Sequence, residues 1–229
     1  HDYVRRTVRN KQRDVALIME EKLLGRGSRP LYKDPLAIVI AVLCVIIFAW
    51  VLFSFRFVGI YVVGSSMEPT LSGAEESYVA GGDYLYADSM AVPDYGDIVV
   101  VLKPNAKEYI IKRVIALGGD AVYMEQGTVY ISYGNSGTFT ALKEDYVLEE
   151  NNDPFLPQNT YRSKSDPLIV PKGSMFLLGD NRGNRHAYSL DSRTYGPFTY
   201  DEMVGVVPRW SISAKSFFTG LYTFVKFGV

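Results

Sequence analysis

One uninterrupted apolar stretch constrains this chain more than any other feature of its sequence. Residues 36–53 read LAIVIAVLCVIIFAWVLF and contain no charged or strongly polar side chain. As a helix rising about 1.5 Å per residue, the stretch would be roughly 27 Å long, which matches the hydrocarbon thickness of a bilayer. We therefore expect a single transmembrane anchor over residues 36–53, in contact with the lipid bilayer.

A cleaved signal peptide or a buried core helix would also supply an apolar stretch. A cleaved signal has a short basic start and a small-x-small cleavage site. Here 35 residues precede the stretch, and no small-x-small pattern follows Phe53 before Gly64. The sequence therefore favours an uncleaved anchor.

The charges before the anchor predict its orientation. Short basic flanks stay in the cytoplasm, and the segment before the anchor carries Arg5, Arg6, Arg9, Lys11, Arg13, Lys22, Arg26, Arg29 and Lys33. We expect residues 1–35 to form a basic cytoplasmic tail and residues 58–229 to lie outside the cytoplasm of a single-pass cell-membrane protein. Within the tail, residues 12–24 suit either a short amphipathic helix on the inner leaflet or a solvated segment.

The sequence after the anchor has the residue pattern of a β-rich domain. Short runs of Val, Ile and Tyr alternate with Gly, Pro, Asp and Asn, and we find no apolar stretch of helical period that lasts ten residues. The fold class predicted is mainly β, behind one N-terminal transmembrane helix. The expected strands are 60–63, 84–87, 97–102, 109–117, 128–132, 174–178 and 203–207.

Two parts of this domain are less regular. Residues 121–173 read as a variable, insertion-like region, because most of them are polar and include several prolines. The apolar and aromatic end, SFFTGLYTFVKFGV, is too short and interrupted to span a membrane. It suits a final strand or a surface that rests on lipid.

Composition excludes several function classes. The chain has 24 Lys and Arg against 25 Asp and Glu, so it lacks the excess of cations that nucleic-acid binding requires. One cysteine, Cys44, rules out an intrachain disulfide framework and a multi-cysteine zinc site. The chain has two histidines, His1 and His186, and so offers few histidine ligands for a metal centre. We expect no nucleic acid, no metal and no other cofactor.

Three polar segments interrupt the apolar pattern. In the first, GSSMEPTL, Ser66 follows a strand and is a candidate nucleophile, although an ordinary serine-rich turn has the same composition. In the second, YIIKRVIALGGD, strand alternation places Lys112 beside Ile110 and Val114. Poor hydration there would lower the lysine pKa, and a neutral lysine can take a proton from a serine hydroxyl. A lysine that reaches solvent from a half-buried strand is the plainer interpretation.

The third segment, LGDNRGN followed by SLDSRTYG, contains two Asp and Arg combinations and several hydroxyl groups. Such a set suits a buried network of hydrogen bonds and ion pairs that holds two loops together. A surface turn would also account for it.

Together these segments resemble bacterial type I signal peptidase, a membrane-anchored Ser–Lys protease. The blocks at Ser66 and Lys112, and the one running from Asp180 to Arg193, match that family in order and approximate spacing. The segment YGDIVVV from Tyr95 is a weaker match. The resemblance covers the anchor, residues 60–120 and residues 174–207, whereas 121–173 matches only in being variable.

The resemblance implies an activity and a set of roles. The chain would remove signal peptides from exported preproteins by cleaving after small residues, with Ser66 as nucleophile and Lys112 as general base. Ser189 would hydrogen-bond the lysine. The supporting scaffold would be Asp180, Arg182, Asp191 and Arg193, and the shallow substrate pockets would be lined by Val62, Met67 and Ile111.

Two departures from the family pattern affect these roles. Four extra residues, 185–188, separate Asn184 from Ser189 and bulge outward or displace Ser189 from Lys112. Gly64 stands where some members carry a hydroxyl that helps bind the oxyanion. The Ser66 backbone N–H would then need a different partner, for which Ser65 is a candidate. Losing one such donor costs about 2.7–4 kcal/mol of transition-state stabilisation.

Three rival functions remain open at this point. A Ser–Lys self-cleaving repressor would need a DNA-binding module and no membrane span. A Ser–His–Asp site would combine His186 with Ser66 and Asp191. The last rival is an inactive or specialised relative that binds exported chains, or that scaffolds or processes pilin-type substrates. Cleavage of a signal-bearing preprotein separates these hypotheses.

Overall fold

The computed structural model describes residues 19, 34–104, 107–183 and 189–228. It divides the chain into two compact units, His1–Phe53 and Ser54–Val229. Helix α2 (Pro35–Arg56) contains the predicted anchor, and none of its residues is buried. It is the one helix in the described part of the chain that is long and apolar enough to cross a membrane. The basic side chains of the tail, and most of residues 12–24, lie outside the described residues.

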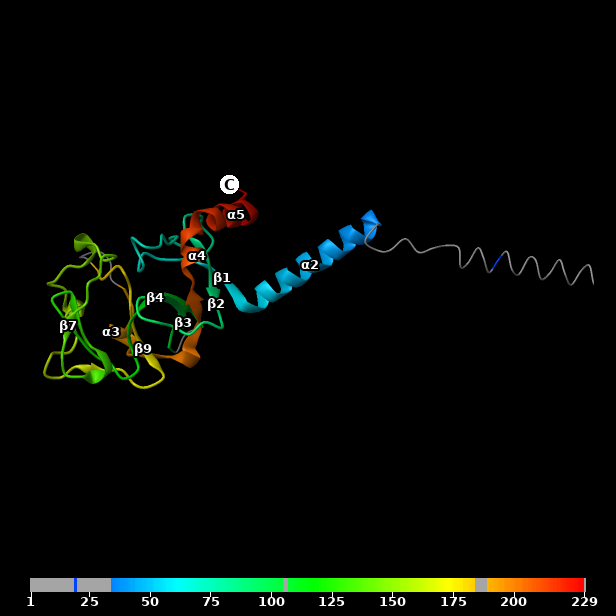
Figure 1. The fold of residues 1–229 in the computed structure, drawn as a ribbon. Helices are drawn as coiled ribbons and strands as arrows, with labels where there is room; N and C mark the ends of the chain where they lie inside the picture. The colour runs from blue at the N-terminus through cyan, green and yellow to red at the C-terminus, as the bar shows by residue number, and fades with distance from the viewer. Residues whose placement is uncertain (1–18, 20–33, 105–106, 184–188, 229) are drawn as a thin grey trace, which may run out of the picture. The chain divides into compact units, whose positions relative to one another are not determined.

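The second unit is built on two antiparallel sheets, which confirms the mainly β prediction (Figure 1). The larger sheet has seven strands in the order β1-β2-β11-β3-β4-β9-β10. Their bounds are β1 Phe57–Tyr61, β2 Tyr84–Asp88, β3 Ile98–Leu102, β4 Tyr109–Leu117, β9 Ser174–Leu178, β10 Phe198–Thr199 and β11 Met203–Val207.

The smaller sheet lies within the predicted insertion-like region. Its four strands run in the order β7-β6-β5-β8, with bounds β5 Ala121–Glu125, β6 Thr128–Ser132, β7 Thr140–Ala141 and β8 Leu168–Ile169. The helices of the second unit are α3 Ser192–Tyr195, α4 Arg209–Ser213 and α5 Lys215–Phe227, with 3-10 turns at Tyr133–Asn135, Glu149–Asn151, Pro157–Asn159 and Tyr200–Glu202.

The core forms where strands bury both faces. In β3 the first four residues are buried, and in β9 all five are. These side chains belong to different apolar clusters on the two faces of the large sheet: Val100 packs with Ile111 and Leu85, while Val99 packs with Leu177. Strand β4 lies between β3 and β9, so its central residues are held from both sides.

Four strands, β4, β6, β9 and β11, begin and end at the predicted residues. The chain's end differs from the prediction of a final strand, because α5 is a helix of 13 residues. Apolar side chains occur on both the inward and outward sides of α5, for example Phe218 and Phe217. The polar residues of this segment nevertheless recur at helical spacing, so its sequence carries a signal for a helix, while its many aromatic residues also suit a strand.

Candidate active site

Ser66 lies on a tight loop between β1 and β2. Gly64 turns the chain with a φ of +80°, which glycine adopts without a steric penalty. Its N–H donates to the Ala74 carbonyl at 2.8 Å, closing the loop on itself. From the other side, Asn181 donates its backbone N–H to the Ser66 carbonyl at 3.1 Å and its side-chain amide to the Ser65 carbonyl at 3.2 Å. The serine is therefore held by contacts within its own loop and by the distant segment that contains Asn181.

Lys112 lies in the middle of β4, paired with Val99 of β3. Its ammonium group donates to Ser66 Oγ at 2.7 Å and to the Ile111 carbonyl at 2.6 Å. The fold thus brings together two residues that are 46 positions apart in the sequence. Both predicted members of the dyad meet at hydrogen-bond distance.

The surroundings of Lys112 favour its neutral form. Only 3% of the residue is exposed, and both acceptors of its hydrogen bonds are uncharged. Burial lowers the pKa of Lys112 from 10.5 to about 8, against the opposing charges of Asp191 and Asp180. A buried amine with such a pKa can exchange a proton near neutral pH.

A groove of about 590 Å³ runs past the dyad. Ser66 and Lys112 line it together with Ile60, Val62, Val100 and Ile111. Two of the three predicted pocket residues, Val62 and Ile111, therefore contribute to the groove. The third, Met67, is fully buried in the core cluster beneath it and is not among the groove-lining residues.

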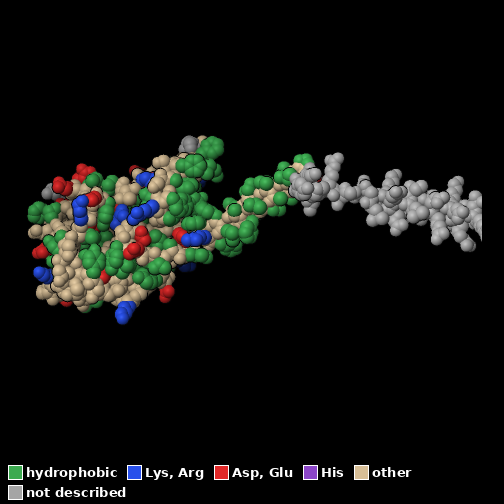
Figure 2. Space-filling view, in the orientation of Figure 1, with side chains coloured by type: hydrophobic (Ala, Val, Ile, Leu, Met, Phe, Trp, Pro, Cys, Tyr) green, Lys and Arg blue, Asp and Glu red, His purple; other side chains and the backbone are tan. Residues whose placement is uncertain are grey.

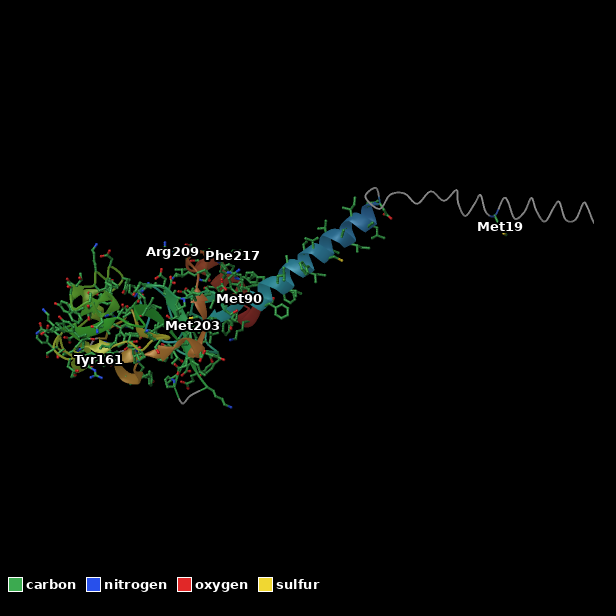
Figure 3. All side chains as sticks on the ribbon, turned by 60° about the horizontal axis from the view of Figure 1, so that its bottom comes forward. Met19, Met90, Tyr161, Met203, Arg209 and Phe217 are labelled. Carbon is green, nitrogen blue, oxygen red and sulfur yellow. The ribbon has the colours of Figure 1, made fainter. Side chains whose placement is uncertain are left out.

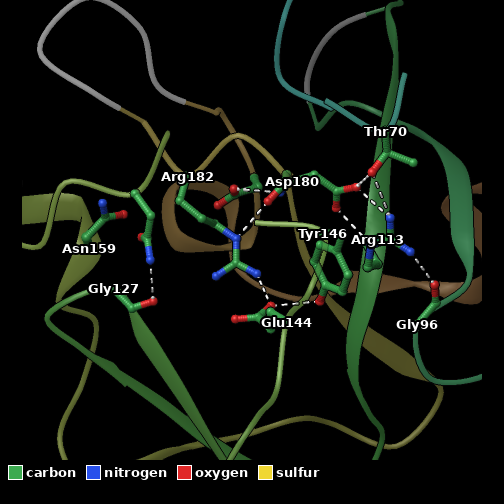
Figure 4. A network of polar contacts seen from close by, with 12 residues as sticks. Thr70, Gly96, Arg113, Gly127, Glu144, Tyr146, Asn159, Asp180 and Arg182 are labelled. Atoms are coloured by element: carbon green, nitrogen blue, oxygen red, sulfur yellow. Dashed lines mark hydrogen bonds and ion pairs between the residues drawn. The ribbon is translucent and has the colours of Figure 1, made fainter. Parts of the chain in front are cut away.

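Next to the dyad, Asp180 and Arg113 form a buried ion pair (Figure 4). Arg113 follows Lys112 on β4 and donates its Nε to Asp180 at 2.8 Å. Asp180 also accepts a hydrogen bond from Thr70 Oγ1 at 2.5 Å, four residues after Ser66 on the same loop. Burial alone would lower the pKa of Arg113, yet hydrogen bonding to Asp180 raises it above the usual value. This guanidinium is a fixed positive charge.

The other scaffold residues form further pairs. Asp191 binds Arg193 through both carboxylate oxygens, each at 2.9 Å, and also accepts from the Gly179 N–H. Arg182 is fully buried, donates to the Gly179 carbonyl at 2.7 Å and is ion-paired with Glu144. The four residues belong to buried ion pairs, in which Asp180 pairs with Arg113 and Arg182 pairs with Glu144. Their role as a scaffold for catalysis stays a prediction.

Ser189 is buried next to the Ser66 loop, and within the described residues it makes no hydrogen bond to Lys112. A Cβ added at Gly179 would lie 2.3 Å from Ser189 Oγ and 2.5 Å from the Ser66 carbonyl, so only glycine fits between them. No hydrogen-bond partner for the Ser189 hydroxyl occurs in the described part of the chain. Residues 185–188, the extra segment, lie outside the described residues. The role of Ser189 toward the lysine stays a prediction.

Sequence reasoning assigned no role to Arg113, Glu144, Tyr146 or Asn181. Arg113 and Asn181 lie inside the quoted blocks, next to the chosen residues, and their partners become evident only when the loops are brought together. Glu144 and Tyr146 come from the polar middle region. Tyr146 packs its ring 3.9 Å from the Arg113 guanidinium and donates its hydroxyl to Glu144 at 2.7 Å. No local pattern in that region marks them.

Comparison with known proteins gives concordant matches. The model of a family described as signal peptidase, peptidase S26, matches residues 36–211. The chain is 34% identical over 170 residues to signal peptidase I T of Bacillus subtilis, covering 74% of this chain and 79% of that protein. It is 32% identical over 167 residues to signal peptidase I P of Bacillus subtilis subsp. natto, covering 72% and 83%.

A more distant relative and a solved structure also match. Thylakoidal processing peptidase 1 of Arabidopsis thaliana is 28% identical over 152 residues, which cover 62% of this chain and 38% of that protein. The crystal structure of a signal peptidase I from Enterococcus faecalis aligns with a TM-score of 0.38 and 30% identity, covering 52% of this chain and 100% of that one.

Proposed function

The chain belongs to the signal peptidase family, peptidase S26, and on that premise we propose that it removes signal peptides from exported preproteins with Ser66 and Lys112 as its catalytic dyad. The observation that carries the assignment is the 2.7 Å contact between Lys112 Nζ and Ser66 Oγ, made by a lysine that is 3% exposed. A surface lysine would be hydrated and protonated, and it would have no means of activating the serine.

The proposed reaction begins with neutral Lys112. Its amine accepts the Ser66 hydroxyl proton while Oγ attacks the scissile carbonyl carbon, and the electron pair moves to the carbonyl oxygen. The resulting ammonium then returns the proton to the leaving amine as the peptide bond breaks. Water repeats the sequence on the acyl-enzyme and releases the signal peptide. The Ile111 carbonyl, 2.6 Å from Nζ, keeps the amine aimed throughout.

The oxyanion needs donors that point to the developing charge. We propose the Ser66 backbone N–H as one of them, since no group in the described part of the chain accepts its hydrogen bond. The Ser65 hydroxyl is the proposed second donor. We further propose that Val62 and Ile111, which line the groove beside Ser66, select the small side chains before the cleavage site.

We also propose the orientation of the anchor. The nine basic residues before it favour a cytoplasmic N-terminus, which would place residues 58–229 on the side where signal peptides emerge. Protease added to the outside of cells stripped of their wall should then digest the domain and spare the N-terminal tail. Digestion of the tail alone would contradict this orientation.

Preprotein cleavage tests the proposed function itself. The purified full chain, in detergent or vesicles, should convert a signal-bearing preprotein to its mature form, and mass spectrometry should place the cut after a small residue. Ser66→Ala should stop the conversion, while Ser65→Ala should reduce it and leave the cleavage site unchanged. Equal cleavage by the wild type and by Ser66→Ala would contradict the assignment of the nucleophile.

A further inference from the structure

The middle region, residues 121–173, packs directly against strands β4 and β9. Met124 of its small sheet belongs to the same apolar cluster as Ile115 of β4 and Phe176 of β9. Tyr161 of the same region, labelled in Figure 3, lies with its ring 5.5 Å from that of Phe176. The region predicted to be insertion-like therefore shares a core with the strand that carries the lysine of the dyad.

Three arginines of the buried ion pairs each contact this region. Figure 2 shows acidic and basic side chains scattered over the visible face of the second unit. By contrast, the side chains of Arg113, Arg182 and Arg193 are only 11%, 0% and 3% exposed. Their partners from the middle region are the Tyr146 ring for Arg113, the Glu144 carboxylate for Arg182 and the Asn159 amide oxygen for Arg193. The middle region thus meets the charged groups around the dyad at three points.

Glu144 completes the charge balance of these groups. The other two arginines pair with aspartates that lie in the segments quoted for the family resemblance. Within the described residues, those segments provide no carboxylate to Arg182, and a buried cation without a partner is strongly destabilising. Glu144 is that partner, with 8% of its side chain exposed. Tyr146 donates its hydroxyl to the carboxylate at 2.7 Å and so fixes its orientation.

Arg182 connects this carboxylate to the nucleophile. Its Nε donates to the Gly179 carbonyl at 2.7 Å. Gly179 lies tightly against Ser66, because a Cβ added there would come within 2.5 Å of the Ser66 carbonyl oxygen. Two residues later, Asn181 donates its backbone N–H to the same carbonyl at 3.1 Å. The guanidinium therefore fixes the segment 179–181, against which the backbone of the serine rests.

From these contacts we infer that Glu144 is a positioning residue, which holds Arg182 against the segment that supports Ser66. The inference rests on the proposed function. Without the carboxylate, the Arg182 guanidinium would turn toward water, and the Gly179 carbonyl would lose its donor. Ser66 Oγ would then be displaced from the 2.7 Å distance at which Lys112 takes its proton. The middle region thereby contributes a residue on which the catalytic rate depends.

Steady-state kinetics of Glu144→Gln tests the inference, with the purified full chain in detergent and a soluble peptide as substrate. Glutamine keeps the shape of the side chain and removes its charge. We expect kcat to fall about ten- to a hundredfold, the order that misplaced reacting groups produce. KM should stay within about twofold of wild type, because the groove is unchanged. The pH at which kcat/KM levels off should stay at about 8, because Lys112 keeps its own surroundings.

Asp145→Asn is the matched control from the same segment. It breaks an ion pair with Lys143 in which the side chains are 77% and 86% exposed, so kcat should stay within about twofold of wild type. An unimpaired Glu144→Gln enzyme beside an active wild type would overturn this inference alone, and so would a loss explained by a shifted pH profile. An inactive wild type would instead overturn the proposed function, and the inference with it.

A double variant separates positioning from stability. Glu144→Gln leaves Arg182 buried without a carboxylate, whereas Glu144→Gln combined with Arg182→Met removes both charges and should unfold at a higher denaturant concentration. The kcat of the double variant should nevertheless stay as low as that of the single variant, because methionine donates no hydrogen bond to the Gly179 carbonyl. Recovery of both stability and kcat in the double variant would overturn the inference, because it would show that Glu144 acts on stability alone.

Tyr146→Phe keeps the test decisive if the charge variants do not fold. It retains the ring against Arg113 and removes only the hydroxyl that orients Glu144. Because one hydrogen bond is lost, kcat should fall about two- to tenfold while KM is retained. An unchanged kcat in this variant would overturn the inference.

Discussion

Two neighbouring basic residues on one strand differ in how readily they lose their charge. Lys112 and Arg113 are neighbours on β4, and alternation turns them to opposite faces. On one face, Lys112 donates to the uncharged oxygens of Ser66 and Ile111, and burial lowers its pKa to about 8. On the other face, Arg113 meets the buried carboxylate of Asp180 and the ring of Tyr146. The strand therefore separates a group that can exchange a proton from a charge that is fixed in place.

The difference shows what determines the role of a buried cation. Burial penalises both charges, and the partner decides the outcome. A carboxylate compensates Arg113 and connects β4 to the Ser66 loop through Thr70. Lys112 lacks such a carboxylate in direct contact within the described residues, so it can become neutral while the neighbouring scaffold stays rigid.

The most damaging change should be Lys112→Met. Methionine keeps most of the apolar stem and removes the amine, so Ser66 loses its base while the strand stays packed. We expect cleavage of a soluble peptide to fall by more than about a thousandfold. Because the dyad acts as a unit, Ser66→Ala combined with Lys112→Met should be no slower than either single variant. A further large loss in the double variant would contradict joint action.

Breaking the ion pair between Arg113 and Asp180 should lower the free energy of unfolding more than it lowers the catalytic rate. Arg113→Gln leaves Asp180 buried without its cation, which costs about 3–5 kcal/mol of unfolding free energy. Arg162→Gln is the matched control, because it breaks an exposed pair with Asp166 that is worth at most about 1 kcal/mol. Denaturant unfolding in detergent measures both. Similar small losses would show that the buried pair does not brace the site.

The low pKa of Lys112 also predicts a pH-dependent stability. Between pH 8 and 10.5 the unfolded chain holds a proton on Lys112 that the folded chain has lost, so unfolding free energy rises with pH. The gain should approach about 3 kcal/mol across this window. Lys112→Met should lack it, and the difference between the two unfolding curves isolates the lysine. Parallel curves would indicate an ordinary lysine pKa.

The smallest effect should come from His186→Ala. Position 186 lies outside the described residues, and the proposed reaction assigns it no proton transfer. Peptide cleavage by this variant should remain within about twofold of wild type. A substitution that removes no core packing, buried polar contact or catalytic group usually has a small effect. A loss comparable to that of Lys112→Met would favour the Ser–His–Asp alternative.

Much of this site could be predicted from the sequence, and the missed partners of its charged residues share a physical cause. The bounds of β4 follow from its run of branched residues, and the pairing of Ser66 with Lys112 followed from a family resemblance. The sequence did not predict the partners of Asp180 and Arg182, because these partners depend on which loops meet after folding. Glu144 was not predicted as the partner of Arg182 for the same reason, and its polar surroundings in the sequence do not distinguish it. Helix α5 could have been predicted from the helical spacing of its polar residues, but its aromatic residues also suit a strand.

The pH dependence of kcat/KM on a soluble peptide tests the central claim most directly, because it reports the titration of the base in the free enzyme. If Lys112 is that base, the rate should rise about tenfold per pH unit below its pKa and level off above about pH 8. The His186→Ala variant should give the same curve. An inflection near pH 6.5, the ordinary histidine pKa, that disappears in His186→Ala would contradict the Ser–Lys assignment.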